Sequence, residues 1–248
     1  MSIASVLSRR HAVTIVARDM PGDPPSTDWA SPWAGASFIF GGCNNRREMQ
    51  MQLDAFVELW RLSDTCPGSG VKKMSINDVF DEEKGDRDVW WKDHVTEFRW
   101  LGKEELPLGA KCGITYKTLV MNPNVFLLWF KSQLESQGVV FKRMHLDALE
   151  DVDAIGHDVL VNASGFGSKF LTDIRDEAVE LIRGQTIVVR SDYDRYFMRD
   201  NGRTYTYAIP RGDGTVVLGG VRHRDSSSTK PDAATTEDVS HDTQNVQA

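Results

Sequence analysis

The sequence has little of what a disulfide-stabilised or zinc-binding protein needs. Its 248 residues include three cysteines, Cys43, Cys66 and Cys112, which lie far apart and form no CxxC pair. Neither a disulfide framework nor a zinc site is therefore expected, and a reducing compartment fits best. The sequence also lacks an apolar run long enough to span a bilayer. The first residues, MSIASVLSRRH, fit a short helix leading into a strand better than an Arg-rich transit peptide or a secretory signal.

Positive charge is not in excess either. The 36 acidic residues outnumber the 29 Lys and Arg residues, which gives a formal net charge of -7. Nucleic acids and anionic membranes both require concentrated Lys and Arg, so we expect neither as a main partner. The motifs HExxH, GxSxG and GxxxxGK[ST] do not occur, and the six histidines lie singly. These absences argue against a metalloprotease, a serine hydrolase of the elbow type and a P-loop enzyme.

What is present favours an α/β fold. The run AVTIVA at 12–17 is continuous, apolar and β-rich, which is typical of a buried parallel strand. The segment 122–138 predicts a helix, with Asn122 as N-cap, Pro123 at the first helical position and Gly138 beyond the end. Strand-like segments VVFKRM and DVLVNASGFGSK follow it. Strand, helix and strand together indicate a parallel sheet whose ligand should lie at the carboxyl ends of the strands.

The rest of the chain predicts one more helix and a second sheet. Apolar residues at helical spacing mark a core-facing helix over 44–62, with a stripe of Met49, Leu53, Phe56, Val57 and Trp60. The segment 63–108 alternates turns with short apolar pieces and reads as an irregular lobe of strands. The apolar or alternating runs GQTIVVR, RTYTYAIPR and TVVLGG, bounded by turn residues, predict an antiparallel sheet.

Candidate binding residues lie at the strand ends. Arg18 and Asp19 close the first strand, where an α/β dinucleotide fold holds the groups that meet the adenosine ribose. Ser164 and Gly165 close another strand, where small residues allow close approach of a cofactor. The stretch ASPWAGASF places Trp33 among small residues, which allow either close packing or the approach of backbone amides to a ligand. For each of these features taken alone, the alternative is that the residues only form the turn at the end of a strand and bind no ligand.

Four segments, taken together, make the sequence recognisable: ARDMPGDPPSTDWASPWAGASF, DVLVNASGFGSK, IRGQTIVVRS and YAIPRGDGTVVLGG. In order and spacing they resemble the fungal type of the D-amino-acid oxidase family, and the resemblance runs from about residue 2 to residue 220. It implies an FAD-binding, Rossmann-like parallel sheet, here without its first strand, joined to an antiparallel β substrate domain. The implied parts are FAD-binding at 1–62 and 122–183, substrate domain at 63–121 and 184–224, and a mobile tail at 225–248, which is poor in large apolar residues.

The resemblance also implies which residues would bind the cofactor. Arg18 and Asp19 would meet the adenosine end of FAD, and Leu146 would flank the adenine. Ser164 and Gly165 would close over the cofactor. The flavin itself would be lined, largely through backbone contacts, by Ser31, Trp33, Ala34 and Gly35.

Two residues are implied on the substrate side. Tyr207 matches the tyrosine whose hydroxyl helps to hold the substrate carboxylate, although the residue alone reads as a half-buried strand tyrosine. Arg222 stands where yeast-type members carry a second active-site tyrosine. It would change substrate preference or supply a replacement cation, and the plain alternative is a solvated arginine.

The implied reaction needs no acid–base dyad from the protein. A hydride passes from the α-carbon of a D-amino acid to the flavin, dioxygen reoxidises the flavin to give hydrogen peroxide, and the imino acid hydrolyses to a 2-oxo acid. Protein catalysis would then be orientation of the substrate. The implied partners are a small D-amino acid and dioxygen, and the resemblance allows a homodimer. It implies a peroxisomal location, with the cytoplasm as the alternative because the sequence carries no S-K-L type terminus.

The sequence also departs from the family pattern. It contains no GxGxxG turn for the pyrophosphate, no GLRP-like arginine segment for the substrate carboxylate and no final flavin-contacting segment. We therefore expect residues 1–248 by themselves to be poorly soluble, to hold FAD weakly and to show little oxidase activity. Two hypotheses stay open: an FAD-dependent oxidase of D-amino acids, or of another amino acid such as D-aspartate, and a non-catalytic remnant of that fold. Bound yellow flavin distinguishes them.

Overall fold

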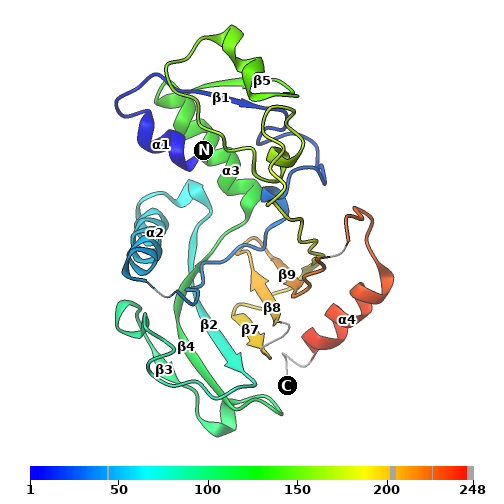
Figure 1. Cartoon of the computed structure of the whole chain (residues 1–248). Helices are drawn as coiled ribbons and strands as arrows, with labels where there is room; N and C mark the ends of the chain where they lie inside the picture. The colour runs from blue at the N-terminus through cyan, green and yellow to red at the C-terminus, as the bar shows by residue number, and fades with distance from the viewer. Residues whose placement is uncertain (44, 202–204, 225, 245–248) are drawn as a thin grey trace. The chain divides into compact units, whose positions relative to one another are not determined.

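The computed structural model describes residues 1–43, 45–201, 205–224 and 226–244 (Figure 1). The chain divides into two compact units, and the first comprises Met1–Trp29, Phe130–Arg183 and His223–Ser228. The second comprises Ala30–Trp129, Gly184–Arg222 and Thr229–Ala248. The breaks after 29 and 129 differ from the sequence-predicted boundaries at 62 and 121, because the segment after Trp29 belongs with the larger sheet. The domain roles inferred from the sequence remain predictions.

The first unit is built on a short parallel sheet. Its regular elements are α1 (Ser2–Leu7), β1 (Thr14–Ala17), β5 (Val140–Arg143) and the C-terminal part of α3 (Pro123–Ser136). Strands β1 and β5 lie side by side and parallel (Figure 1), with Ala17 paired to Arg143 at their carboxyl ends. Apolar side chains of the helices and strands surround a small core of Ala4, Leu134 and Val139. The predicted helix over 122–138 and the strand that follows it are therefore present as α3 and β5.

A third parallel strand, predicted over DVLV, is absent. Residues 158–163 form neither helix nor strand, and Val159 is 77% exposed. An isolated extended segment has no hydrogen-bond ladder, and within the described residues the parallel sheet consists of β1 and β5. The predicted glycine turn does follow, as a 3-10 helix at Gly165–Lys169. A second 3-10 helix of this unit spans Leu149–Ile155.

The second unit is built on a larger mixed sheet. Its strands are β2 (Lys72–Phe80), β3 (Arg99–Trp100), β4 (Cys112–Val120), β6 (Ile187–Arg190), β7 (Tyr196–Asp200), β8 (Tyr205–Pro210) and β9 (Thr215–Gly219). They lie in the order β3-β4-β2-β7-β8-β9-β6. All neighbours pair antiparallel except β2 and β7, which are parallel. The strand β7 was not predicted, because it is short and its two buried aromatic residues, adjacent in sequence, face opposite sides of the sheet.

Helix α2 (Arg46–Thr65) covers one face of this sheet (Figure 1). Asn45 begins it as N-cap, since its side-chain oxygen accepts a hydrogen bond of 2.9 Å from the amide of Glu48. Phe56 is buried in the sheet core, as the apolar stripe predicts. Val57 was assigned to the same stripe, but it is 64% exposed because it lies one position round the helix from Phe56.

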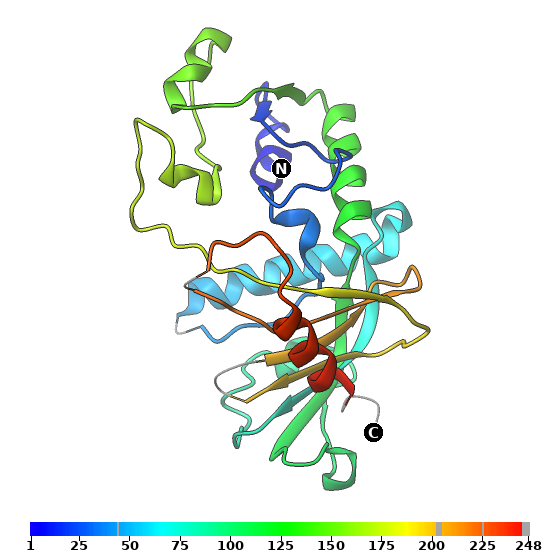
Figure 2. The ribbon, with the colours of Figure 1, turned by 90° about the vertical axis from the view of Figure 1, so that its right-hand side faces the viewer.

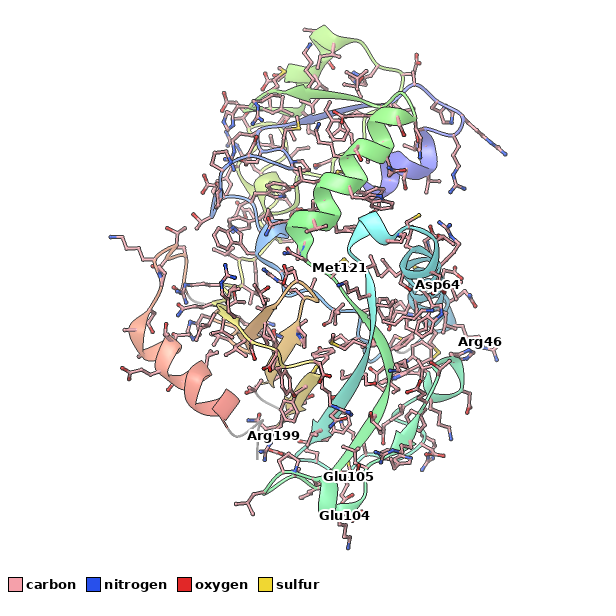
Figure 3. The ribbon with its side chains drawn as sticks, turned by 180° about the vertical axis from the view of Figure 1, so that it is seen from behind. Arg46, Asp64, Glu104, Glu105, Met121 and Arg199 are labelled. Carbon is pink, nitrogen blue, oxygen red and sulfur yellow. The ribbon has the colours of Figure 1, made fainter. Side chains whose placement is uncertain are left out.

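The two faces of the sheet bury separate cores. The α2 side holds the larger core, which includes Phe56, Ile76, Ile114, Tyr116 and Tyr196. The opposite side holds a smaller core of Val79, Phe197, Ala208 and Val216. Figure 3 shows Met121 at one end of β4, and Glu105 near the other end of this strand. Three short 3-10 helices border the sheet, at Pro67–Ser69, Lys92–His94 and Lys103–Glu105.

The segment predicted as a mobile tail contains helix α4 (Ala233–Gln244), which lies beside β8 and β9 (Figures 1 and 2). Asp232 precedes the helix, and its carboxylate accepts a hydrogen bond of 2.7 Å from the amide of Thr235. Val239 is 4% exposed. One capped turn and one buried apolar side chain thus give this polar segment regular structure that its composition did not predict.

Candidate functional site

The carboxyl end of β1 is held by a network of ion pairs. The guanidinium of Arg18 donates to Asp19 at 2.8 Å from Nε. Arg143, at the end of β5, forms two hydrogen bonds to the Asp23 carboxylate, at 2.7 and 2.6 Å, and a third to the carbonyl oxygen of Arg18 at 2.7 Å. The hydrogen bonds from Arg143, with a further one from the amide of Met20, lower the pKa of Asp23 to about 2. The loop after β1 therefore has a defined path, which sets where Arg18 and Asp19 lie.

No local sequence pattern points to Arg143 or Asp23 as part of this edge. Only strand pairing reveals their place, because the parallel register of β1 and β5 puts Arg143 opposite Ala17. The same pairing brings half-buried Leu146, three residues past β5, to the strand edge that carries Arg18. The structure therefore gathers part of the predicted adenosine-end set at one edge of the parallel sheet.

Ser164 and Gly165 form a separate turn in the first unit. The Ser164 hydroxyl lies 2.7 Å from Asn162 Oδ1 and 2.7 Å from the hydroxyl of Ser168, so its partners are local. No hydrogen bond joins this turn to Arg18 or Asp19 among the described residues. Gly165 has a φ of +57°, and a β-carbon built on it would meet no atom within 4 Å. Protein packing leaves the space over Gly165 open.

The loop that carries Trp33 opens the second unit. A 3-10 helix at Ser31–Trp33 begins it, and Ser31 and Ala34 are exposed. Reciprocal backbone hydrogen bonds of 3.1 and 3.0 Å tie Ala36 to Met121, which Figure 3 labels at the end of β4. Trp33 is 46% exposed. The loop is thus anchored to the sheet at one end while its indole faces outward.

Gly35 shows that part of the small-residue requirement comes from packing. A β-carbon at Gly35 would lie 2.5 Å from Cδ1 of Ile209, a buried residue of β8. In the described part of the chain, however, the amide N–H of Gly35 has no hydrogen-bond acceptor. Packing therefore explains the missing side chain, and the unsatisfied amide leaves a donor for a ligand.

The substrate-side candidate Tyr207 lies on β8 beside a second tyrosine. The rings of Tyr205 and Tyr207 stack, with centroids 5.6 Å apart and planes inclined by 26°. Burial, with a smaller contribution from Tyr205, raises the pKa of Tyr207 to about 12. The Tyr207 hydroxyl therefore keeps its proton near neutral pH and can donate a hydrogen bond to an anion.

Arg222 lies against the same aromatic pair. Its guanidinium carbon is 4.2 Å from the ring centroid of Tyr205, which is a cation–π contact. Arg222 is exposed, and no carboxylate pairs with it in the part of the chain that the structure describes. The structure thus brings the predicted residues Tyr207 and Arg222 to one place through Tyr205. Tyr205 was not among the predicted residues, although its position two residues before Tyr207 puts both rings on one face of the strand.

Arg211, which was not among the predicted residues, contacts the loop that carries Trp33. It follows β8 directly, is 8% exposed, and donates hydrogen bonds to the carbonyl oxygens of Gly35 and Ala34 at 2.6 and 2.9 Å. Burial lowers the pKa of Arg211. The apolar residues of the motif YAIPR predict a strand, but nothing in the sequence shows that the side chain of Arg211 turns inward.

The described residues carry neither a metal centre nor a membrane span. No group of three His, Cys, Asp or Glu side chains there could hold a metal ion. Among the same residues, no helix is long and apolar enough to cross a membrane.

The fold with a small parallel sheet and a larger mixed sheet occurs in solved oxidase structures. Glycine oxidase from Geobacillus kaustophilus shares it, with a TM-score of 0.69 at 15% identity over 98% of this chain and 73% of that one. The chain belongs to the DAO family of FAD-dependent oxidoreductases, whose family pattern matches residues 1–246. This match and the resemblance inferred from sequence agree.

The curated relatives are oxidases. A D-aspartate oxidase of Talaromyces thermophilus is 29% identical over 93% of this chain and 70% of its own length. A D-amino-acid oxidase of Fusarium vanettenii is 28% identical over 94% of this chain and 70% of its own length. The chain thus spans about 70% of each relative. The predicted class, a flavoenzyme oxidoreductase of the D-amino-acid oxidase type with FAD as cofactor, is confirmed.

Proposed function

We propose that this protein oxidises D-amino acids. The balanced reaction converts a D-amino acid, dioxygen and water into a 2-oxo acid, ammonia and hydrogen peroxide. The observation that carries this proposal is the stacked pair of Tyr205 and Tyr207 on β8, in which Tyr207 supplies a protonated hydroxyl and Tyr205 carries the guanidinium of Arg222 on its ring. A hydroxyl donor and a cation on one aromatic pair suit the carboxylate of an amino acid. The names of the curated relatives support the same substrate class.

The residues present fit an FAD cofactor in two respects. The open space over Gly165 admits a ligand where a β-carbon would intrude, and the free amide of Gly35 offers a donor. We propose that Arg18, Asp19 and Leu146 bind the adenosine end, that Ser164 and Gly165 close over the cofactor, and that Ser31, Trp33, Ala34 and Gly35 line the flavin. FAD supplies the acceptor for the hydride that leaves the substrate α-carbon.

The protein's own contribution in this proposal is orientation. Tyr207 donates to the substrate carboxylate, and its fixed ring limits rotation of the bound amino acid. Arg222 neutralises carboxylate charge from the same side. Holding the α-hydrogen toward the acceptor lowers the entropic part of the barrier, and no side chain has to move a proton.

A second candidate substrate is an acidic D-amino acid such as D-aspartate. The exposed guanidinium of Arg222, stacked on Tyr205 and without a carboxylate partner among the described residues, favours it. If Tyr207 holds the α-carboxylate, Arg222 is free to meet a second carboxylate on the substrate side chain. The D-aspartate oxidase relative supports this alternative.

The test combines a flavin spectrum with peroxide detection. A longer version that also contains a GxGxxG turn and an arginine segment of the family type is expected to carry yellow flavin and to release peroxide with D-alanine or D-aspartate and not with the L-enantiomers, whereas residues 1–248 by themselves are expected to hold FAD weakly. Arg222→Ala should lower kcat/KM for D-aspartate more than for D-alanine if the acidic substrate is preferred, and equally for both if Arg222 binds the α-carboxylate. A flavin-loaded protein that is inactive with every D-amino acid would overturn the proposal. A protein that binds no FAD would favour the non-catalytic remnant.

A further inference from the structure

We infer that Arg211 is a positioning residue for the proposed flavin-lining loop, and that it turns the Gly35 amide toward the cofactor. The inference rests on the proposed function only in taking this loop as the cofactor contact. Arg211 itself touches neither substrate nor cofactor in this assignment. It acts through two backbone carbonyl groups.

The Arg211 guanidinium lies in an unusual environment. Buried arginines are normally paired with carboxylates, because an isolated buried charge is costly. Here the fork donates to the carbonyl oxygens of Gly35 and Ala34 at 2.6 and 2.9 Å, and no carboxylate forms a hydrogen bond or ion pair with it in the described residues. Such an arrangement is maintained only where two strong bonds offset the burial.

The acidic residue whose charge acts on Arg211 is hydrogen-bonded to other residues. Asp213 lies in the turn after Arg211, and its carboxylate accepts hydrogen bonds from Asn122 at 2.7 Å and from the Thr215 hydroxyl at 2.6 Å. Its charge raises the pKa of Arg211, against the larger lowering by burial. Asp213 thus acts on the Arg211 guanidinium only through its charge, and the hydrogen bonds of the guanidinium go to the loop.

The peptide bond between Ala34 and Gly35 is trans. In a trans peptide the C=O and N–H bonds point in opposite directions. Because the Ala34 carbonyl points to Arg211, the Gly35 N–H points away from it. The Gly35 amide, as noted above, has no hydrogen-bond acceptor among the described residues. The guanidinium therefore both fixes the peptide plane and, by withdrawing electron density at the carbonyl, strengthens the outward donor.

The test compares Arg211→Met and Arg211→Lys with a matched control, Arg199→Met. Arg199 lies on β7 of the same sheet (Figure 3), and its Nε donates to Asp81 at 2.8 Å, so the control removes an arginine fork that does not touch the loop. The readouts are the FAD dissociation constant, hydrogen exchange of residues 31–38 with and without FAD, and the melting temperature.

We expect Arg211→Met to weaken FAD binding about tenfold or more and to abolish the protection that FAD gives the Gly35 amide. Arg211→Lys should recover part of both effects, because an ammonium can satisfy one carbonyl. Arg199→Met should lower the melting temperature without changing FAD affinity. Equal FAD affinity for the wild type and Arg211→Met, or an equal loss in the Arg199→Met control, would overturn the inference. Failure of the flavin-loaded wild type to oxidise D-amino acids would contradict the proposed function and leave this comparison valid.

Discussion

The phenolic oxygen of Tyr207 on β8 lies directly against the backbone of Gly219 on β9. A β-carbon added at Gly219 would overlap this oxygen, and the two residues are register partners across the strand pair. The next glycine is equally constrained, since Gly220 has a φ of +141° and its β-carbon would overlap the carbonyl oxygen of Tyr205. Gly219 therefore leaves room for the Tyr207 ring, and Gly220 lets the end of β9 approach the backbone of Tyr205.

The first prediction concerns the Tyr207 hydroxyl. In Tyr207→Phe, apparent affinity for a D-amino acid should fall by about 1.5–3 kcal/mol, the range for hydrogen bonds to charged groups. Gly219→Ala should weaken affinity as well, because the methyl group displaces the hydroxyl. In the Tyr207→Phe background, adding Gly219→Ala should cost less affinity than in the wild type, because the hydrogen bond that the methyl group disrupts is already absent, although the methyl group still meets ring Cζ. Steady-state kinetics measure this cycle. An unchanged KM and kcat in Tyr207→Phe would make the tyrosine structural.

A second prediction separates packing from cofactor approach at Gly35. Gly35→Val should obstruct FAD binding, but its side chain also meets Ile209 Cδ1, so loss of flavin by this variant alone is ambiguous. Ile209→Val removes Cδ1 at a cost of about 0.5–1.5 kcal/mol in stability. We expect Gly35→Ala to weaken FAD binding, because the clash with Ile209 displaces the loop that carries the Gly35 amide, and we expect Ile209→Val to restore part of the FAD affinity. Full recovery of FAD affinity in the double variant would show that the loop glycine serves packing alone.

The third prediction concerns Gly165 and has a matched control in Gly138. Both glycines lie in the first unit with positive φ, +57° and +85°, and with no atom within 4 Å of an added β-carbon. Alanine at either should cost about 1–2 kcal/mol of stability through backbone strain. Only Gly165→Ala is expected to raise the FAD dissociation constant, because its methyl group would enter the space proposed for the cofactor. Equal dissociation constants for the two variants would remove Gly165 from the cofactor site.

A fourth prediction follows from the buried carboxyl of Asp78 on β2. Burial, with a further contribution from Asp200 and an opposing one from Lys84, raises its pKa to about 7 from 3.8. Asp78 Oδ1, Trp91 Nε1 and the Tyr116 hydroxyl have no hydrogen-bond partner among the described residues. The folded protein therefore keeps the Asp78 proton over a pH range in which the unfolded chain loses it.

The sign follows from linkage. Between pH of about 4 and 7 the unfolded state binds fewer protons, so stability falls as the pH rises, and the loss levels off above the folded pKa. Asp78→Asn does not titrate, so its stability relative to the wild type should rise by roughly 1–3 kcal/mol from pH 4 to pH 8. Urea unfolding across this range measures the difference, with the exposed Glu104→Gln as control (Figure 3). Parallel curves for the wild type and Asp78→Asn would contradict a protonated Asp78.

The sequence by itself determined the fold class, the cofactor class and most regular elements. Local signals sufficed for these: Pro123 and Gly138 bracket α3, and the apolar runs place β1, β5, β8 and β9 within a few residues of their observed bounds. Composition did not reveal helix α4 in the tail, and the apolar run DVLV forms no strand because no neighbouring strand pairs with it among the described residues.

Only the tertiary structure decided which side chains meet. Arg143 joins the Arg18 loop through the parallel register, and Arg211 holds Gly35 and Ala34 from 176 and 177 positions further along the chain. Such contacts are invisible in a single sequence, because an arginine reads the same whether it is solvated or buried against carbonyl groups. The physical reason is that hydrogen-bond partners are chosen by chain topology, whereas local propensity fixes only the elements that the topology brings together.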